Sequence, residues 1–190
     1  PCPIVERKPE LKQNEILFAG TVIPRKGYAV LIRSFAKIAK KHLDWKVVIA
    51  GNGEIDKAKA VAKECGIEDQ VVFLGWVKGH AKDLAFQRAS IYCLASDGEG
   101  FPKGVLDAWA YGIPCVVTPV GGLPDIVVDG ENALVFPVGD VDVLARQLER
   151  MISDDELREK IADASLALVH TTFNIECINK KMEKIYDRFK

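Results

Sequence analysis

The sequence lacks a long hydrophobic run, a net charge of any size and any low-complexity segment. No apolar stretch approaches the roughly 20 residues that span a bilayer, so we expect no transmembrane helix. Lysine and arginine number 26 against 27 aspartate and glutamate, which leaves a formal net charge of -1. General nucleic-acid binding needs a clustered basic excess, and this balance gives no reason to expect it.

Cysteine and histidine are scarce, and neither has the spacing of a metal site. The three histidines show no arrangement that indicates catalysis, and no Cys-x-x-Cys pair occurs. Free cysteine within an apolar strand behaves as a small hydrophobe. We therefore expect no metal, no disulfide framework and a reducing, cytoplasmic location. The five cysteines are Cys2, Cys65, Cys93, Cys115 and Cys177.

Short apolar runs alternate with amphipathic stretches as far as Val138. The apolar runs predict strands at Ile16–Val22, Lys46–Ala50, Val71–Leu74, Ile91–Ala95, Pro114–Thr118 and Ala133–Phe136. The stretches between them predict helices at Tyr28–Lys41, Ile55–Glu64, Ala81–Arg88 and Lys103–Tyr111. Nearly continuous apolar strands are typical of a sheet covered on both faces. Residues 1–190 are thus predicted to form a single α/β domain with a doubly wound, parallel, six-stranded sheet flanked by helices.

Beyond Val138 the sequence predicts a helical C-terminus. Helices are expected at Asp140–Met151, Asp154–Val169 and Ile175–Phe189. Asp140-Val141-Asp142 could be mistaken for a metal-binding pair of aspartates. Because a glycine and then Asp140 come before an apolar-periodic run, we interpret Asp140 as a helix N-cap.

The most informative segment joins the strand that ends at Ala95 to a helix that begins near Pro102. Gly98 and Gly100 are expected to adopt backbone angles that side chains resist, and Pro102 suits the first turn of a helix. Free N–H groups at the start of a helix bind phosphate or sugar hydroxyls. Gly104 would leave that approach open.

Two carboxylates accompany this turn. Glu99 lies within it and Asp107 lies about one helical turn further on, so both can line one cleft. A carboxylate accepts hydrogen bonds from two hydroxyls, which suits the paired hydroxyls of a ribose or a hexose. The pattern favours a sugar-nucleotide site. For Asp107 alone, the competing interpretation is a helix-surface ion pair with Lys103.

This segment resembles the donor-binding half of the retaining glycosyltransferases of the GT-B fold, the glycosyl transferases group 1 family that includes bacterial capsule and lipopolysaccharide enzymes. That family carries a Glu, seven residues and a second Glu, then a phrase like Glu-Ala-Met-Ala-x-Gly-x-Pro-Val-Val; here the segment is 99–117. The likeness covers most of the chain. Further matching pieces, in the family's order, are 18–20, 26–27, 49–53, 72–75, 121–125 and 129–132.

The resemblance implies a Rossmann-like domain that binds a nucleoside diphosphate sugar, UDP- or GDP-linked, with no cofactor or metal required. Lys26 and Arg25 would offset charge on the leaving phosphates, and Glu99 would hold the sugar. Glu99 and Lys26 are thus the expected catalytic residues. Trp76 could stack on the base or simply cover the core. The expected donor-binding residues are Arg25, Lys26, Gly53, Trp76, Val77, Glu99, Gly100, Phe101, Lys103, Gly104 and Asp107.

Four positions depart from the family's pattern. Thr21 stands where an arginine is usual, and Arg25 is expected to replace that charge. Asp107 is one methylene shorter than glutamate, so its contact with a ribose could be longer or bridged by water. Pro102 offers no N–H, which leaves any anion contact to its neighbours. Ala133 replaces a common glycine.

The resemblance also implies half of an enzyme, because a GT-B transferase has two Rossmann-like halves. The sequence has no initiating Met, and we expect the N-terminal, acceptor-binding half to be absent from it. The parent would transfer a hexosyl group with retention to a glycan or lipid-linked acceptor, in the cytoplasm and with peripheral contact to the inner membrane face. The domain alone is not expected to complete transfer. Its last helix would pack on the other half through Tyr186 and Phe189.

Two other functions stay open at this point. A sugar phosphorylase or a sugar-nucleotide epimerase is built on the same fold. A non-catalytic regulatory or scaffolding domain could have kept the fold and lost donor binding, and Thr21 gives that alternative some weight.

Overall fold

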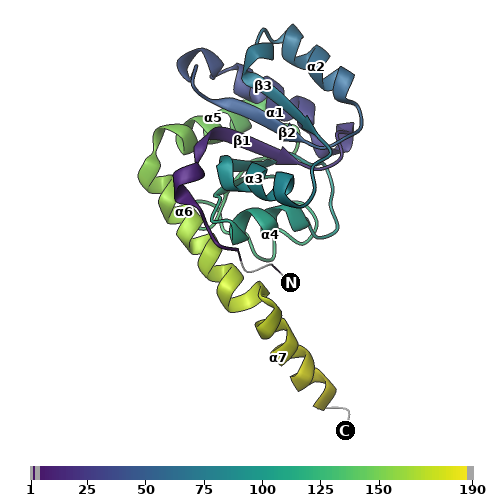
Figure 1. Cartoon of the computed structure of the whole chain (residues 1–190), viewed down its shortest axis with the longest axis vertical. Coiled ribbons are helices and arrows are strands. Elements are labelled where there is room, and N and C mark those ends of the chain that lie inside the picture. Colours follow the sequence, from purple (N-terminus) through teal and green to yellow (C-terminus); the bar gives the residue numbers. More distant parts are fainter. Residues whose placement is uncertain (1, 3–4, 188–190) are drawn as a thin grey trace.

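The computed structural model describes Cys2 and residues 5–187. Its centre is one sheet of parallel strands in the order β3-β2-β1-β4-β5-β6 (Figure 1). The strand order changes direction between β1 and β4, which defines a doubly wound α/β fold and confirms the predicted class. The strands are β1 (Gln13–Ala19), β2 (Lys46–Ala50), β3 (Val71–Gly75), β4 (Ala89–Leu94), β5 (Cys115–Val117) and β6 (Leu134–Val135).

Both faces of the sheet are covered, as the continuous apolar strands predict. Because successive side chains of a strand point to opposite faces, Ile16 and Phe18 of β1 enter one core and Leu17 enters the other. The first core packs under α1 (Tyr28–Ala36), α2 (Ile55–Glu64) and α5 (Val141–Ser153), and the second under α3 (His80–Arg88) and α4 (Lys103–Ala110).

The first strand and the first helix differ from their predicted bounds. β1 begins at Gln13 because that residue already pairs with Ala89 of β4, and it ends before the loop at 20–22. The helix predicted to reach Lys41 ends at Ala36, and a 3-10 turn, η3 (Ala39–Lys41), follows it. Ala39 is still buried there, so the apolar periodicity continues while the backbone tightens.

Three helical N-termini in the C-terminal third are capped by side chains. Asp140, Asp154 and Asn174 each accept a hydrogen bond from the backbone N–H three residues later. The prediction of Asp140 as an N-cap is therefore confirmed. Asp142 forms an ion pair with Lys37 at 2.9 Å. The remaining elements are α6 (Asp155–Leu168), the π-helical turn η5 (Val169–Phe173) and α7 (Ile175–Tyr186).

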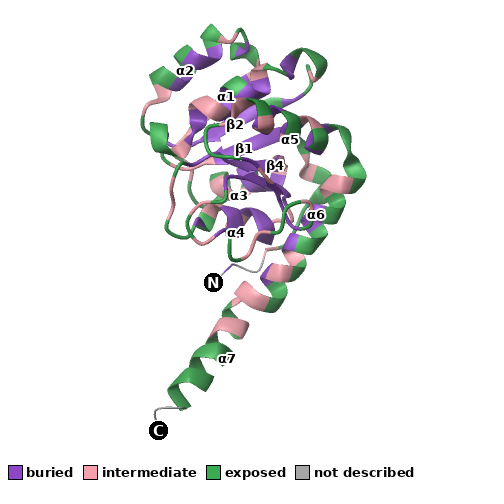
Figure 2. Cartoon of the chain, turned by 180° about the vertical axis from the view of Figure 1, so that it is seen from behind, coloured by how far each residue is buried: buried purple, intermediate pink, exposed green. Residues whose placement is uncertain are grey.

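Helix α7 extends away from the body of the domain (Figures 1 and 2). None of its residues is buried, although four large apolar side chains are exposed at Ile175, Met182, Ile185 and Tyr186. The predicted contact residue Phe189 lies outside the described residues. In the described part of the chain, no helix combines the length and the hydropathy that crossing a membrane requires.

All the cysteines are free. Cys93 of β4 and Cys115 of β5 are fully buried, and burial raises the pKa of both thiols above its ordinary value. These two side chains are small core residues, as predicted.

Candidate functional site

The loops that follow the four central strands meet at the C-terminal edge of the sheet. The N–H of Gly20 donates to the carbonyl of Ala50 at 3.0 Å, and the N–H of Asp97 donates to the carbonyl of Arg25 at 2.8 Å. Gly53 pairs with Val22 in an isolated bridge. In an open parallel sheet this edge, beside the point where the strand order reverses, is where ligands bind.

The turn that carries Lys26 lies directly against the end of β4. Lys26 is the last residue of the 3-10 turn η2 (Pro24–Lys26), and Gly27 follows with a φ of 69°. A Cβ at Gly27 would lie 1.9 Å from the carbonyl oxygen of Ala95. Glycine alone suits both this φ and this approach, so Gly27 lets the lysine turn dock on the segment after β4.

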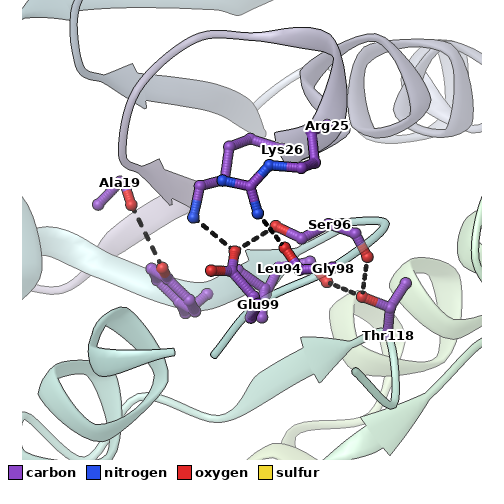
Figure 3. Close-up of polar contacts among 9 residues, drawn as sticks. Ala19, Arg25, Lys26, Leu94, Ser96, Gly98, Glu99 and Thr118 are labelled. Carbon is purple, nitrogen blue, oxygen red and sulfur yellow. Dashed lines mark hydrogen bonds and ion pairs between the residues drawn. The ribbon is translucent and has the colours of Figure 1, made fainter. Parts of the chain in front are cut away.

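That docking brings Lys26 onto Glu99 (Figure 3). The ammonium Nζ lies 2.5 Å from Glu99 Oε1, and the Ser96 hydroxyl donates to the same oxygen at 2.7 Å. The Glu99 side chain is only 10% exposed and that of Lys26 22%. Among the described residues, Glu99 Oε2 has no hydrogen-bond partner. The site therefore holds a fixed carboxylate with one oxygen still able to accept.

Ser96 is itself positioned by a hydrogen bond from a residue that follows the neighbouring strand β5. Its backbone carbonyl accepts a 2.7 Å hydrogen bond from the hydroxyl of Thr118, which follows β5 (Figure 3). Both side chains are fully buried. The orientation of Glu99 is thus set by buried residues that follow two neighbouring strands, and no pattern in the sequence indicated this support.

Arg25 fixes the same turn from the solvent side. Its guanidinium Nη1 donates to the carbonyl of Gly98 at 2.5 Å. Arg25 and Thr21 are both exposed, and the replacement of the family's usual charge by Arg25 stays a prediction.

The prediction for Gly98 and Gly100 was wrong. Neither has a positive φ, and a Cβ on either would meet no atom within 4 Å. The constrained glycine is Gly121, whose φ is 60° and whose Cβ would lie 2.2 Å from the carbonyl oxygen of Gly100. The turn after β4 is therefore shaped by the loop packed against it rather than by its own glycines.

A pocket of about 360 Å³ lies at the same edge of the sheet and brings four of the predicted residues together. Trp76 is 66% exposed, so it does not serve to cover the core, and Val77 is half-buried. The lining residues are Ala19, Gly20, Ala50, Trp76, Val77, Lys78, Gly79, Lys82, Phe86, Gly104 and Asp107.

Asp107 is paired across the pocket, and its partner is not the one considered from the sequence. Lys82 of α3 places its Nζ 2.7 Å from Asp107 Oδ2. The alternative of an ion pair with Lys103 is wrong; Lys103 is the exposed first residue of α4. Sequence reasoning missed Lys82 because the two partners lie 25 residues apart on different helices.

A close contact that the sequence did not indicate explains why position 104 is a glycine. A Cβ there would lie 2.2 Å from the hydroxyl oxygen of Tyr92, which is buried beneath it and donates to the carbonyl of Ala19 at 3.4 Å. Burial raises the pKa of Tyr92 well above its ordinary value, so the hydroxyl stays protonated. Gly104 thus lets α4 approach the sheet while its backbone lines the pocket.

Gly100, Phe101 and Lys103 continue the turn but do not line the pocket. The Phe101 ring is tilted against that of Phe173 in η5, with centroids 6.2 Å apart, and the residue is 45% exposed. Pro102 is the N-cap of α4, with a ψ of 94°.

Elsewhere, a cavity of about 640 Å³ lies between α3 and the first three strands, and Val77 alone of the predicted site residues lines it. Over the described ranges, no cluster of three or more His, Cys, Asp or Glu could hold a metal ion.

Comparison with known proteins decides the family. The model of the family described as "Glycosyl transferases group 1" matches residues 4–166. The chain belongs to this family. A glycosyltransferase of Methanocaldococcus jannaschii, described as uncharacterized, is 33% identical over 175 residues, which are 92% of this chain and 45% of that protein. The chain spans about half the length of the curated relatives it matches.

Two solved structures, the first described as that of a glycosyl transferase group 1 family protein, show the same architecture. The C-terminal domain of LpcC from Francisella tularensis is similar over 86% of this chain and 88% of that domain, with 27% identity and a TM-score of 0.78. HepE of Anabaena, in complex with UDP-glucose, is similar over 93% of this chain and 49% of its own, with 21% identity and a TM-score of 0.83. At that identity the second likeness shows the fold alone.

Proposed function

We propose that this chain is the nucleotide-sugar-binding domain of a hexosyltransferase and that the donor binds at the C-terminal edge of the sheet. The observation that carries the proposal is the Lys26–Glu99 pair, in which a cation and a carboxylate with a free oxygen stand side by side at the switch point. A nucleoside diphosphate sugar presents an anionic diphosphate next to sugar hydroxyls, which matches that pair in charge and in hydrogen bonding.

The diphosphate would lie against Lys26 and the loop of Arg25. As the bond between sugar and phosphate breaks, negative charge grows on the leaving diphosphate, and a preorganised cation stabilises that charge more than it stabilises the ground state. The backbone N–H groups at the start of α4, from Lys103 and Gly104, would add dipoles of the same sign. This scheme requires no metal.

Glu99 would hold the sugar through Oε2 while Lys26 and Ser96 fix Oε1. A carboxylate that binds hydroxyls from the side is not thereby placed under the anomeric carbon, so we do not assign it as a nucleophile. The nucleoside would enter the 360 Å³ pocket, with Asp107 toward the ribose and Trp76 and Val77 toward the base.

The acceptor would be bound by a second domain. This is suggested by the length of the relatives, of which the chain spans only about half. We infer that transfer proceeds with retention, to a glycan or lipid-linked acceptor, in the cytoplasm and at the inner face of the membrane. The exposed apolar face of α7 would pack against that second domain, since a helix with such a face is stable when it is covered.

The proposal is tested by calorimetric titration with UDP, GDP, ADP and UDP-glucose. The chain should bind nucleotides of one base. Lys26→Met should lower the affinity for the nucleoside diphosphate of that base at least about tenfold and change the affinity for the corresponding nucleoside much less. Lys63→Met, an exposed lysine at the end of α2, is the matched control and should bind like the unmodified chain.

Glu99→Gln separates the sugar from the diphosphate. It removes the carboxylate that would accept the sugar hydroxyls and frees Lys26 for phosphate, so the affinity for UDP-glucose relative to UDP should fall. Absence of nucleotide binding, or binding that ignores Lys26→Met, would contradict the proposal and support a domain that has lost its donor site.

A further inference from the structure

Lys82 and Asp107 form an ion pair in the lining of the 360 Å³ pocket. Lys82 belongs to α3 and Asp107 to α4, and the atoms Nζ and Oδ2 are 2.7 Å apart. Both residues line the pocket, and their side chains are 44% and 23% exposed. The pair therefore joins α3 and α4 within the lining of the pocket.

The ammonium of Lys82 has a second contact besides Asp107. Nζ lies 5.4 Å from the ring centroid of Phe86, a buried residue that also lines the pocket. Phe86 is in turn stacked on the buried Tyr92, with centroids 6.1 Å apart. A cation near an aromatic face is attracted to it, so Lys82 has a defined position rather than that of a freely moving surface lysine.

The pair leaves one carboxylate oxygen able to accept a hydrogen bond from a ligand. Asp107 Oδ1 has no hydrogen-bond partner among the described residues, whereas Oδ2 is occupied by Lys82. An ammonium has three N–H donors, of which one is used here. A ligand hydroxyl can therefore donate to Asp107 Oδ1 while Lys82 holds Oδ2 in place.

We propose that Lys82 is a positioning and specificity-determining residue: it orients Asp107 so that this carboxylate recognises a ribose hydroxyl and the site disfavours deoxyribonucleotides. This inference rests on the proposed function, because it takes the nucleoside to occupy this pocket. Lys78 lines the same pocket but forms no ion pair within the described part of the chain. Lys78→Met is therefore a matched control, because it removes a positive charge from the pocket without removing the partner of Asp107.

The experiment compares UDP with 2′-deoxy-UDP and 3′-deoxy-UDP, or the same set for whichever base binds, by calorimetry. A hydrogen bond to a charged group supports a preference of about tenfold or more for UDP over one of the deoxynucleotides. Lys82→Met should reduce that preference to about threefold or less, and Lys82→Arg should retain most of it. Lys78→Met should lower the affinity for all three nucleotides and leave the preference intact.

Asp107→Asn and its combination with Lys82→Met complete the test. If Lys82 acts through Asp107, the double variant should lose no more of the ribose preference than Asp107→Asn alone. Thermal unfolding of each variant shows whether the domain is still folded, and a mere loss of stability does not change the ratio of two affinities.

Two results overturn this inference while the proposed function stands. One is an unchanged ribose preference in Lys82→Met. The other is tighter UDP binding in that variant, which would mean that the pair must open to admit the ligand. If the unmodified chain binds no nucleotide, the proposed function and this inference fail together.

Discussion

A double-mutant cycle on Lys26 and Glu99 measures how strongly the two sides of the candidate site are coupled in the folded chain. The perturbations are Lys26→Met, Glu99→Gln and the two combined. The side chains are 22% and 10% exposed and their charged atoms are 2.5 Å apart. The pair thus lies between exposed ion pairs, which contribute about 0.2 to 1 kcal/mol, and buried ones, whose breaking costs about 3 to 5 kcal/mol.

Lys26→Met should lower the free energy of unfolding by about 1 to 3 kcal/mol, because it leaves a nearly buried carboxylate with only the Ser96 hydroxyl as partner. Glu99→Gln should cost less, since Lys26 can turn toward water. The coupling energy should be about 1 to 2 kcal/mol, measured by urea unfolding of the four proteins at pH 7. A coupling below about 0.3 kcal/mol would mean that the pair does not form in solution, and the reasoning about the site would be wrong.

Three further changes test the fold around the site. Gly27→Ala should destabilise the domain by at least about 3 kcal/mol in urea unfolding, because the new Cβ meets the carbonyl of Ala95 and the φ of 69° disfavours alanine. Asn132→Ala should cost about 2 kcal/mol in the same assay, since the buried amide accepts from one backbone N–H and donates to one carbonyl, each at 2.8 Å. Lys12→Met should alter the pH dependence of stability, because burial and the nearby Arg7 lower the pKa of Lys12 to about 8. From about pH 8 to 10.4 the unfolded chain holds a proton on Lys12 that the folded chain has released. Stability relative to Lys12→Met should therefore rise by about 1 to 2 kcal/mol between pH 7.5 and 9.5.

The controls and contrary results are specific to each change. Gly66→Ala has a similar φ of 67° but no atom within 4 Å of the added Cβ, so it isolates the backbone cost; equal losses at both glycines would contradict the close approach at Gly27. Near-native stability of Asn132→Ala would mean that the hydrogen bonds of the Asn132 amide do not stabilise the loop that contains it. The cysteines are the same in Lys12→Met and in the unmodified chain, so their contributions to the pH dependence cancel in the comparison. Parallel curves of stability against pH for the two proteins would exclude a lowered pKa of Lys12.

The sequence predicts the fold closely because local pattern and tertiary role agree in most elements. The apolar strands are continuous since both faces of the sheet are covered, and α2 has the predicted bounds, Ile55–Glu64. The first helix was predicted too long, because apolar periodicity does not distinguish an α-helix from the 3-10 turn at Ala39. The start of β1 was missed because Gln13 and Asn14 are polar and belong to the sheet only through pairing.

From the residues alone, the candidate site could be predicted only where its parts lie close together in the sequence. The family resemblance was needed to assign Lys26 and Glu99, which are 73 residues apart, to one site. The turn from Ser96 to Asp107 carries enough pattern to indicate a carboxylate beside a helix start. Contacts between distant segments have no such signal: Lys82 meets Asp107, and Gly27 meets Ala95, only once α3 and η2 are docked. For the same reason Gly98 and Gly100 were assigned a constraint that belongs to Gly121.

The most direct test of the central claim is where the nucleotide binds. Amide NMR spectra of this 20.9 kDa chain, recorded during titration with the nucleotide diphosphate that binds, locate the site residue by residue. We predict the largest shifts at Gly20, Gly27, Val77 and Gly104, at the C-terminal edge of the sheet. Shifts confined to the cavity between α3 and the first three strands, around Leu74 and Arg88, or no saturable shifts with any nucleotide, would contradict the account.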